Sequence, residues 1–170
     1  MFAVLVTGAP GAGKTDCLIA LTDALIDDEI AHATIDVDEV AWSYPYPTNE
    51  QRCALLAAAW EAHRRAGHEL LLFADVVESG DHLEQLLGAV GADDHLLVRL
   101  EAPRAMLRQR ILAREPTDWS GLEYLLAQSE SWTAALERLD GVHVTVDTAR
   151  MSPGEIAARI RAERPDKLGG

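Results

Sequence analysis

The residues best suited to chemistry lie near the start of the chain, where glycines, a lysine and a threonine occur at fixed spacing. The segment consists of Gly8, Ala9, Pro10, Gly11, Ala12, Gly13, Lys14 and Thr15, and it matches G-x-x-x-x-G-K-[ST] at every fixed position. Its glycines permit a tight turn whose amide groups can approach an anion. Lys14 supplies a positive charge for β- and γ-phosphates, and the Thr15 hydroxyl can ligate Mg²⁺. The segment therefore predicts a phosphate-binding loop (P-loop) that binds ATP with Mg²⁺.

The flanking sequence agrees with this interpretation. The apolar run Phe2–Thr7 precedes the loop as an expected strand, and Lys14–Asp27 follows it as an expected helix. The positive end of that helix then points at the bound phosphates, and we include Asp16 in its first turn among the nucleotide-binding residues. The alternative is a glycine-rich strand-to-helix turn with an incidental lysine, but the full pattern seldom arises by chance.

A second group of candidate residues is acidic and follows the next expected strands. Asp36 and Asp38 come after the strand His32–Ile35, and Asp75 follows Glu69–Phe73. Ligands of open parallel sheets sit at the carboxyl ends of the strands, so these acids are expected beside the P-loop. We predict that Asp36 supports Mg²⁺ or accepts a proton from the substrate, with Asp38 on the same side if the strand extends that far. The alternatives are a solvated acidic helix start for the first pair and a plain strand-end aspartate for Asp75.

Three aromatic residues follow these acids in a segment interrupted by prolines. Trp42, Tyr44 and Tyr46 lie within five positions of one another. Together with Asp38 they are predicted to bind a planar or apolar substrate that a few polar groups orient. The alternative is a loop whose rings pack against the following helix.

Arginines provide the third candidate group. Arg110 and Arg114 are i,i+4 neighbours on the expected helix Pro103–Arg114, so they share a face that can reach a nucleotide over the P-loop. The alternative is a solvated basic helix end. Arg104 and Arg108, on the same helix, are predicted to be surface residues.

Other candidates have weaker support. Thr148 and Arg150 follow the last expected strand and are predicted, on topology alone, to line the adenine pocket. Trp119 lies on a segment that can close over substrate, whereas Trp60 and Trp132 are predicted to be packing residues. The six histidines show no ligand spacing, and we assign them no chemistry.

Short apolar runs that alternate with helical patterns must position these residues. The expected strands are Phe2–Thr7, His32–Ile35, Glu69–Phe73, His95–Leu100 and Val142–Val146. The expected helices are Lys14–Asp27, Thr48–Ala66, Asp81–Ala89, Pro103–Arg114, Gly121–Leu139 and Pro153–Glu163. This alternation predicts a parallel sheet covered on both faces, a three-layer α/β sandwich. We expect one domain over residues 1–164, with a lid at about 115–121, and a frayed tail over 165–170.

Composition restricts the partners. Fifteen basic and 28 acidic residues give a net charge of −13, which argues against nucleic acid as a partner. No apolar run is long enough to span a membrane, and the start of the chain is expected to be a buried strand rather than a signal peptide. The two cysteines, Cys17 and Cys53, have no metal-ligand spacing and suggest a reduced cytoplasmic protein, which we expect to be a monomer or a homodimer.

The P-loop, the Asp36-Val37-Asp38 strand end and the Leu107-x-x-Arg110-x-x-x-Arg114 pattern together resemble the small P-loop kinases of the gluconate-kinase, shikimate-kinase and chloramphenicol-phosphotransferase type, within the adenylate-kinase-like group. The resemblance implies a five-stranded sheet of order 2-3-1-4-5 and a mobile lid after Arg114. It also implies that Arg110 covers adenine, that Arg114 meets phosphate, and that Thr148 and Arg150 border the base.

The chain also departs from these relatives in ways that restrict the acceptor. Val37 replaces the glycine of the adenylylsulfate-kinase D-G-D-x-x-R signature, and the basic residues that hold anionic acceptors are not evident after Asp38. We therefore predict an ATP-dependent phosphotransferase for a small neutral or aromatic hydroxylated acceptor, with Lys14, Asp36 and Arg114 as catalytic residues. The alternatives are an ATP-binding regulatory or resistance protein without transfer activity and a simple NTPase.

Overall fold

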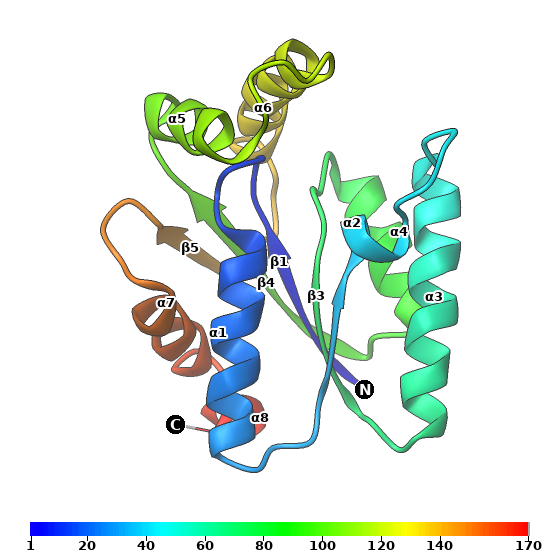
Figure 1. Ribbon diagram of the computed structural model, residues 1–170. Coiled ribbons are helices and arrows are strands. Elements are labelled where there is room, and N and C mark those ends of the chain that lie inside the picture. Colours follow the sequence, from blue (N-terminus) through cyan, green and yellow to red (C-terminus); the bar gives the residue numbers. More distant parts are fainter. Residues whose placement is uncertain (170) are drawn as a thin grey trace.

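The computed structural model describes residues 1–169, which alternate between strands and helices (Figure 1). The strands are β1 (Phe2–Thr7), β2 (Ala33–Asp36), β3 (Leu70–Ala74), β4 (Asp94–Glu101) and β5 (Val144–Asp147). The helices are α1 (Lys14–Asp27), α2 (Val37–Val40), α3 (Asn49–Arg65), α4 (Gly80–Val90), α5 (Arg104–Arg114), α6 (Leu122–Leu136), α7 (Pro153–Arg161) and α8 (Pro165–Leu168).

The five strands form one parallel sheet in the order β2-β3-β1-β4-β5, which confirms the predicted topology. β1 is the central strand, and its Phe2 is in register with Leu70 on one side and Asp94 on the other. Every residue of β1 is buried, because helices cover both faces of a parallel sheet. The P-loop follows this strand and therefore begins at the middle of the sheet.

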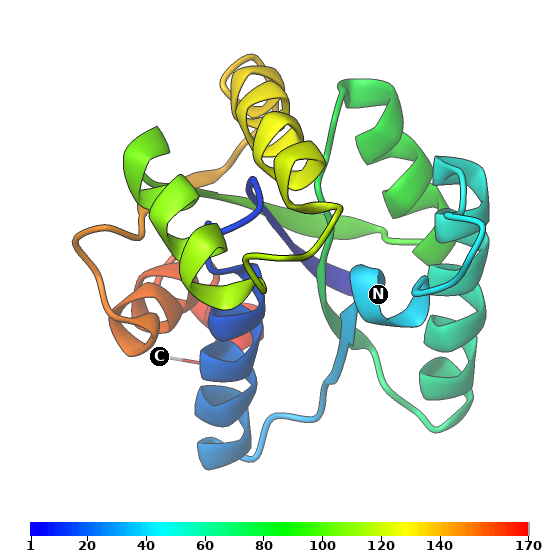
Figure 2. The same cartoon turned by 45° about the horizontal axis from the view of Figure 1, so that its top comes forward.

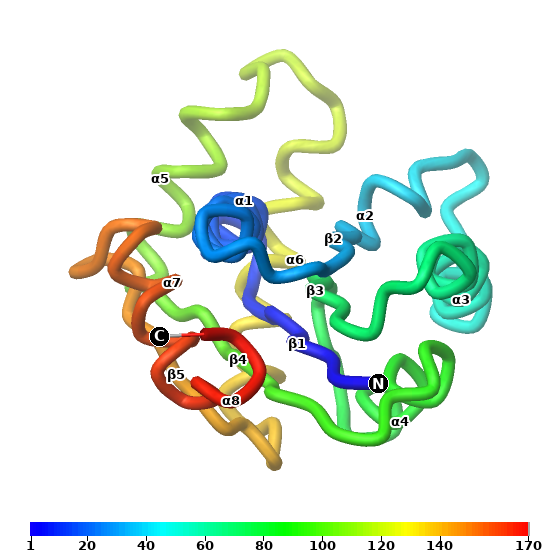
Figure 3. Tube along the Cα trace, turned by 90° about the horizontal axis from the view of Figure 1, so that it is seen from below, coloured from blue at the N-terminus to red at the C-terminus, as the bar shows by residue number. Residues whose placement is uncertain are grey.

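The helices form two layers around the sheet. α1 and α7 pack together on one face, and α3 and α4 pack together on the other, as the view from below shows (Figure 3). α5 and α6 stand over the carboxyl ends of the strands (Figures 1 and 2). This arrangement is the predicted three-layer sandwich, with a pair of helices placed over the edge where the candidate residues lie.

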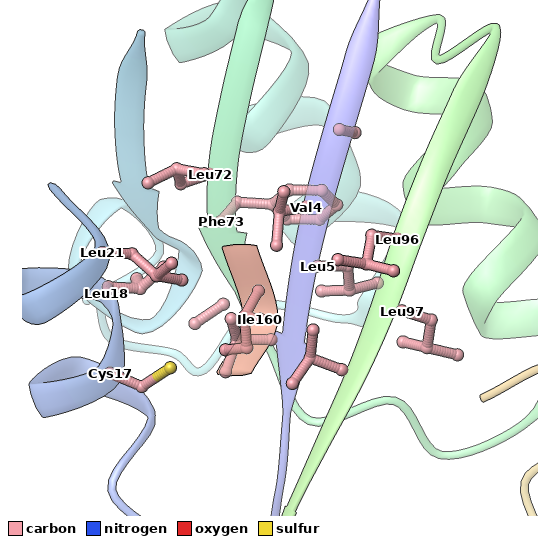
Figure 4. Close-up of a cluster of buried hydrophobic side chains, with 14 of the residues drawn as sticks. Val4, Leu5, Cys17, Leu18, Leu21, Leu72, Phe73, Leu96, Leu97 and Ile160 are labelled. Carbon is pink, nitrogen blue, oxygen red and sulfur yellow. The ribbon is translucent and has the colours of Figure 1, made fainter. Parts of the chain in front are cut away.

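The core fills the space between α1 and the sheet (Figure 4). Leu18 and Leu21 of α1 meet Val4 of β1 and Leu72 and Phe73 of β3. Burial of each such side chain stabilises the fold by about 1.5–3 kcal/mol relative to exposure. The helix that follows the P-loop is therefore firmly attached to the central strands.

Two helices begin with the capping boxes that their sequences encode. The Thr48 hydroxyl accepts from the Gln51 amide while the Gln51 side chain accepts from the Thr48 amide, and Ser152 and Glu155 do the same at α7. Each pair satisfies amide groups that the helix leaves without partners. The starts of α3 and α7 are thus fixed locally.

β2 ends at Asp36 and does not continue through Asp38, as a shared side for the two carboxylates would require. Asp36 is its last residue and caps α2, because the Asp36 carboxylate accepts from the Asp38 amide at 3.1 Å. Asp38 therefore lies in a helical turn, and its direction does not follow the alternation of a strand. The proposal that both carboxylates share one side through strand periodicity is wrong.

The expectation of a frayed tail is also corrected over residues 165–168, which form α8. Leu168 is fully buried, and its carbonyl accepts from Arg161 Nε at 2.9 Å. Arg161 also pairs with Asp28 after α1. An apolar anchor and these polar contacts hold the segment against the body of the domain, and residue 170 lies outside the described residues.

None of the helices within residues 1–169 combines the length and the apolar character needed to cross a membrane.

Candidate active site

One large cavity lies over the carboxyl ends of the strands and contains most of the candidate residues. Its volume is about 1220 Å³. The walls come from the P-loop, the start of α3, the loop between β3 and α4, and the α5–α6 pair. Pockets for a single small ligand typically occupy about 300–1000 Å³, so this cavity has room for two ligands side by side.

The P-loop has the backbone conformation that its glycines were predicted to permit. Gly11 and Gly13 have φ angles of 84° and 93°, which side-chain-bearing residues rarely adopt. Lys14 Nζ donates to the Gly8 carbonyl at 2.9 Å. Burial lowers the pKa of the Lys14 amine, while the charges of Asp38 and Asp36 oppose that shift. The lysine is thus folded over its own loop, among carboxylates.

Two side chains from distant elements fix the outer part of the P-loop. Arg110 of α5 donates to the Gly11 carbonyl at 3.1 Å and to the Thr148 hydroxyl and carbonyl, both at 2.9 Å. Ser129 of α6 donates to the Pro10 carbonyl at 3.2 Å. Arg110 and Thr148 therefore meet beside the P-loop. Ser129 was missed, because a lone serine inside a helix carries no sequence signal for this contact.

Thr15 and Asp36 form the place where a Mg²⁺ ion fits. The Thr15 hydroxyl donates to Asp36 Oδ2 at 3.0 Å, while Asp36 Oδ1 accepts from the Asp38 amide. Within residues 1–169, no three His, Cys, Asp or Glu side chains converge to hold a metal by themselves. Mg²⁺ that is bound with a nucleotide keeps several waters and takes phosphate oxygens, so two protein oxygens suit it. The residues present fit the ion.

Asp38 and Asp75 meet through an arginine that the sequence analysis missed. Arg52 Nη2 lies 2.7 Å from Asp38 Oδ1 and 2.5 Å from Asp75 Oδ1. Arg52 is one turn into α3, a position that resembles any surface residue of an amphipathic helix. All three residues line the cavity. The structure thus adds a guanidinium to the acidic edge of the sheet.

Asp75 has an unusual environment within this cluster. Its side chain is 2% exposed, Oδ1 also accepts from the Val76 amide at 2.8 Å, and Oδ2 has no hydrogen-bond partner among the described residues. Burial raises the pKa of the Asp75 carboxyl, and the neighbouring Arg52 charge opposes this shift. The arginine charge therefore offsets part of the cost of ionising a buried carboxyl group.

The predicted aromatic group divides into residues inside and outside the cavity. Tyr46 lines it, whereas Trp42 and Tyr44 do not and are 87% and 91% exposed. The Tyr44 and Tyr46 rings meet edge to face with their centroids 6.4 Å apart. Trp42 and Tyr44 therefore do not form part of the substrate wall in this conformation, because the loop directs them into solvent.

Aromatic residues that do line the cavity come from the α5–α6 connection and from α6. Trp119, Tyr124 and Trp132 all line it. Trp119 thus lies where a substrate-covering residue was predicted. Trp132 was predicted to be a packing residue, but the inner side of α6 faces the space above the P-loop.

Some of the remaining candidates line the cavity and others do not. Arg114 lines the cavity and pairs with Glu115 at 2.7 Å, and Asp16 lines it at the start of α1. Arg150 is exposed, pairs with Asp147 and does not line the cavity, although Thr148 two residues earlier does. Arg104 and Arg108 are exposed, as predicted, and lie outside the cavity.

One histidine reaches the cavity although none was assigned chemistry. His82 of α4 lines it, and His82 Nδ1 accepts from the Glu78 amide at 3.4 Å. Glu78 and Asn49 line the same wall, where Asn49 Nδ2 donates to Glu78 Oε2 at 3.5 Å. These residues form a polar wall opposite α6.

Comparison with known proteins places the fold. No protein-family model matches the sequence, and no curated protein matches it. Among solved structures, a sugar kinase from Janibacter sp. HTCC2649 has a TM-score of 0.68 at 18% identity, covering 99% of this chain and 96% of that one. The APS kinase of Mycobacterium tuberculosis, in complex with AMPPNP and APS, has a TM-score of 0.66 at 17% identity, with coverages of 94% and 95%.

A third similar structure is the tunicamycin resistance protein of Deinococcus radiodurans, with a TM-score of 0.63 at 18% identity and coverages of 95% and 94%. At such low identities the likeness establishes the fold and nothing finer. The chain has the fold of the small P-loop kinases, as the sequence motifs predicted.

Proposed function

We propose that the protein is an ATP-dependent phosphotransferase that acts on a small hydroxylated acceptor that is not anionic. The observation that carries this proposal is that one cavity joins a complete P-loop to the Asp38–Arg52–Asp75 cluster. A protein that only binds ATP has no need for the second half of such a cavity. The fold shared with kinases supports the same conclusion.

The nucleotide end of the cavity supplies positive charge and backbone donors. Lys14 exchanges its contact with the Gly8 carbonyl for the β- and γ-phosphates of ATP. The edge of the Arg110 guanidinium donates to the Gly11 and Thr148 carbonyls. Its planar face therefore remains available to stack on the adenine ring. Arg114 releases Glu115 to meet phosphate as the 115–121 segment closes.

Thr15, which lines the cavity, and Asp36, which the Thr15 hydroxyl contacts, would hold Mg²⁺ at this end. The bound ion supplies neutralisation of the phosphate charge. In the structure both oxygens of Asp36 already accept hydrogen bonds, and Asp36 does not line the cavity. We therefore assign Asp36 to the metal and not to proton transfer.

Asp38 is the better candidate for the general base. Arg52 donates to its Oδ1 and so fixes the orientation of the carboxylate, while Oδ2 stays available to a ligand. The acceptor oxygen forms a bond to the γ-phosphorus, the bond from that phosphorus to the ADP oxygen breaks, and Asp38 takes the hydroxyl proton before releasing it to water. This proposal replaces the prediction that Asp36 is the base.

The first experiment is ADP release from Mg-ATP with a panel of nucleosides, sugars, sugar acids and aromatic hydroxyl compounds. Lys14→Ala serves as the blank, and Lys167→Ala is the matched control because Lys167 is the only other lysine and is exposed. Acceptor-stimulated release that requires Lys14 is the expected result. Release that no acceptor changes would instead identify an NTPase, and ATP binding without release would identify a nucleotide-binding protein.

A further inference from the structure

The acceptor end of the cavity carries an excess of negative charge. Asp38, Asp75 and Glu78 line it, and the Arg52 guanidinium contacts the first two of these three carboxylates. The other cavity cations, Lys14, Arg110 and Arg114, surround the P-loop. These three are directed to the phosphates of the nucleotide in the function proposed above, so they do not balance the acceptor end.

Arg52 has little capacity to attract an anionic acceptor. Its Nη2 contacts both Asp38 and Asp75, and its side chain is 18% exposed. A carboxylate or phosphate of a ligand would have to compete with both aspartates for the same guanidinium. Like charges placed side by side in a partly desolvated cavity repel strongly, which disfavours acids as acceptors.

Glu78 offers a negative charge that no protein cation neutralises. It is an exposed residue of the loop between β3 and α4, and it has no ion pair within residues 1–169. Its polar neighbour is the Asn49 amide, at 3.5 Å. A donor on the ligand is therefore the missing partner of this carboxylate.

Asp75 gives a second, independent sign of an absent donor. This residue is almost fully buried at the cavity wall, yet its Oδ2 atom has no hydrogen-bond partner in the described structure. A buried polar atom without a partner costs about 1–3 kcal/mol, so a donor that reaches it from the cavity is favoured. Glu78 and Asp75 both line the same cavity.

The cavity lining also contains four aromatic residues. Tyr46, Trp119, Tyr124 and Trp132 line the cavity from the α2–α3 loop, the α5–α6 connection and α6. Aromatic faces attract an ammonium or other cation through their quadrupoles, most strongly in a desolvated site. They also bury the apolar body of a ligand. The cavity thus offers both carboxylates and π faces.

We propose that the phosphoryl acceptor is a hydroxylated amine, protonated at neutral pH, whose ammonium group binds beside Glu78 while its hydroxyl reaches Asp38. This inference rests on the proposed kinase function and names the class of acceptor for that same site. The ammonium supplies the cationic partner that Glu78 lacks, and the aromatic residues cover the remainder of the molecule.

The test uses compounds that match in shape and differ in charge. One set is tyramine, tyrosol and 4-hydroxyphenylacetate, and the other is glucosamine, N-acetylglucosamine and gluconate. Binding is measured by calorimetry with the Mg²⁺ complex of a non-hydrolysable ATP analogue present, and ADP release is measured with Mg-ATP. We expect the amine of a set to bind at least about tenfold more tightly than its neutral and anionic partners, a difference of about 1.4 kcal/mol.

Glu78→Gln tests the residue itself. It is expected to raise the KM for the amine about tenfold, with kcat, the KM for ATP and the KM for the N-acetylated compound unchanged. Glu84→Gln, on the exposed side of α4 and outside the cavity, is the matched control. A merely structural role for Glu78 would move the values for all acceptors together.

The outcomes separate this inference from the function on which it rests. ADP release stimulated by neutral or anionic compounds in preference to amines would overturn the amine proposal and leave the kinase intact. An unchanged amine KM in Glu78→Gln would likewise overturn it. No binding and no stimulation by any charge class would count against both.

Discussion

The two ends of the cavity are built in different ways. The nucleotide end is a continuous loop whose shape follows from Gly11 and Gly13, and Ser129 and Arg110 hold it from outside. The acceptor end combines side chains from α2, α3, the β3–α4 loop and α6. Tyr44, on the loop between α2 and α3, is 91% exposed.

This difference reflects what each end must recognise. Phosphates are common to all nucleotides, so backbone amides at fixed spacing suffice to bind them. A particular acceptor requires side chains of particular charge and shape, and these can come from any element that reaches the cavity. Substitutions in the P-loop are therefore expected to have larger effects than substitutions of the residues around it.

Loss of the P-loop lysine should have the largest effect. We expect Lys14→Ala to lower kcat/KM for ATP by about 10²–10³-fold, because one strong donor to the transferring phosphoryl group is removed. Steady-state kinetics and ATP titration measure this change, and circular dichroism verifies folding. A folded variant with unchanged ATP affinity would contradict the assignment of the loop.

Substitution of the proposed base tests the acceptor end. Asp38→Asn should lower acceptor-dependent kcat by about 100-fold or more while ATP affinity remains close to normal. Asp36→Asn should also lose transfer, but with a raised requirement for Mg²⁺, because Asp36 contacts Thr15. Full turnover in Asp38→Asn, with transfer lost in Asp36→Asn at unaltered Mg²⁺ dependence, would return the role of base to Asp36.

Removal of the arginine between the two aspartates should affect stability. Arg52→Gln is expected to cost about 2–3 kcal/mol of unfolding free energy near pH 8, since a buried carboxylate loses its partner. The pKa of Asp75 is already raised above its ordinary 3.8 by burial, so its ionisation in the folded state destabilises the fold as the pH rises above that value. Without Arg52 this pKa rises further, and the loss should be smaller at pH 5 than at pH 8.

Urea unfolding of wild type and Arg52→Gln at the two pH values measures that difference. Arg65→Gln, on the exposed end of α3, is the matched control. An equal loss at both pH values would show that Asp75 does not depend on Arg52 for its charge.

The loop between α2 and α3 allows two aromatic residues of the acceptor end to be compared, one inside the cavity and one outside it. Tyr46→Ala should raise the acceptor KM about tenfold, whereas Trp42→Ala should leave it nearly unchanged, because only Tyr46 lines the cavity. Kinetics with the best acceptor of the panel decide between the two rings. A larger effect of Trp42→Ala would mean that the loop folds inward when substrate binds.

The smallest effect is expected at the support of the P-loop. Ser129→Ala removes the bond to the Pro10 carbonyl and should cost about 1 kcal/mol in stability, with ATP affinity lowered a few-fold. Ser131→Ala, on the exposed side of α6, is the control. Thermal unfolding and ATP titration should distinguish the two serines, and equal behaviour would remove Ser129 from the loop's support.

The contrast between the two ends also explains how much the sequence predicted. The strands and the P-loop follow from local patterns and a rare motif, the sheet order follows from the resemblance to small P-loop kinases, and the structure agrees with all three. The direction of Asp38 was misjudged because β2 ends at Asp36, whose carboxylate caps α2. The tail was misjudged because the burial of Leu168 depends on tertiary packing.

At the site, residues within recognisable motifs were predictable, and those that helix packing alone brings to the site were not. Arg52 and Trp132 reach the cavity, and Ser129 reaches the Pro10 carbonyl, because of where whole helices pack, which no local spacing encodes. Arg150 follows the last strand as expected, yet its pairing with Asp147 keeps it outside the cavity.

The most direct test of the central claim is the fate of the γ-phosphoryl group, followed by ³¹P nuclear magnetic resonance with Mg-ATP and the best-binding acceptor. The account predicts ADP together with a new phosphate-ester resonance of the acceptor, and the absence of both with Lys14→Ala. Inorganic phosphate as the sole product beside ADP, or ATP that stays intact while bound, would contradict it.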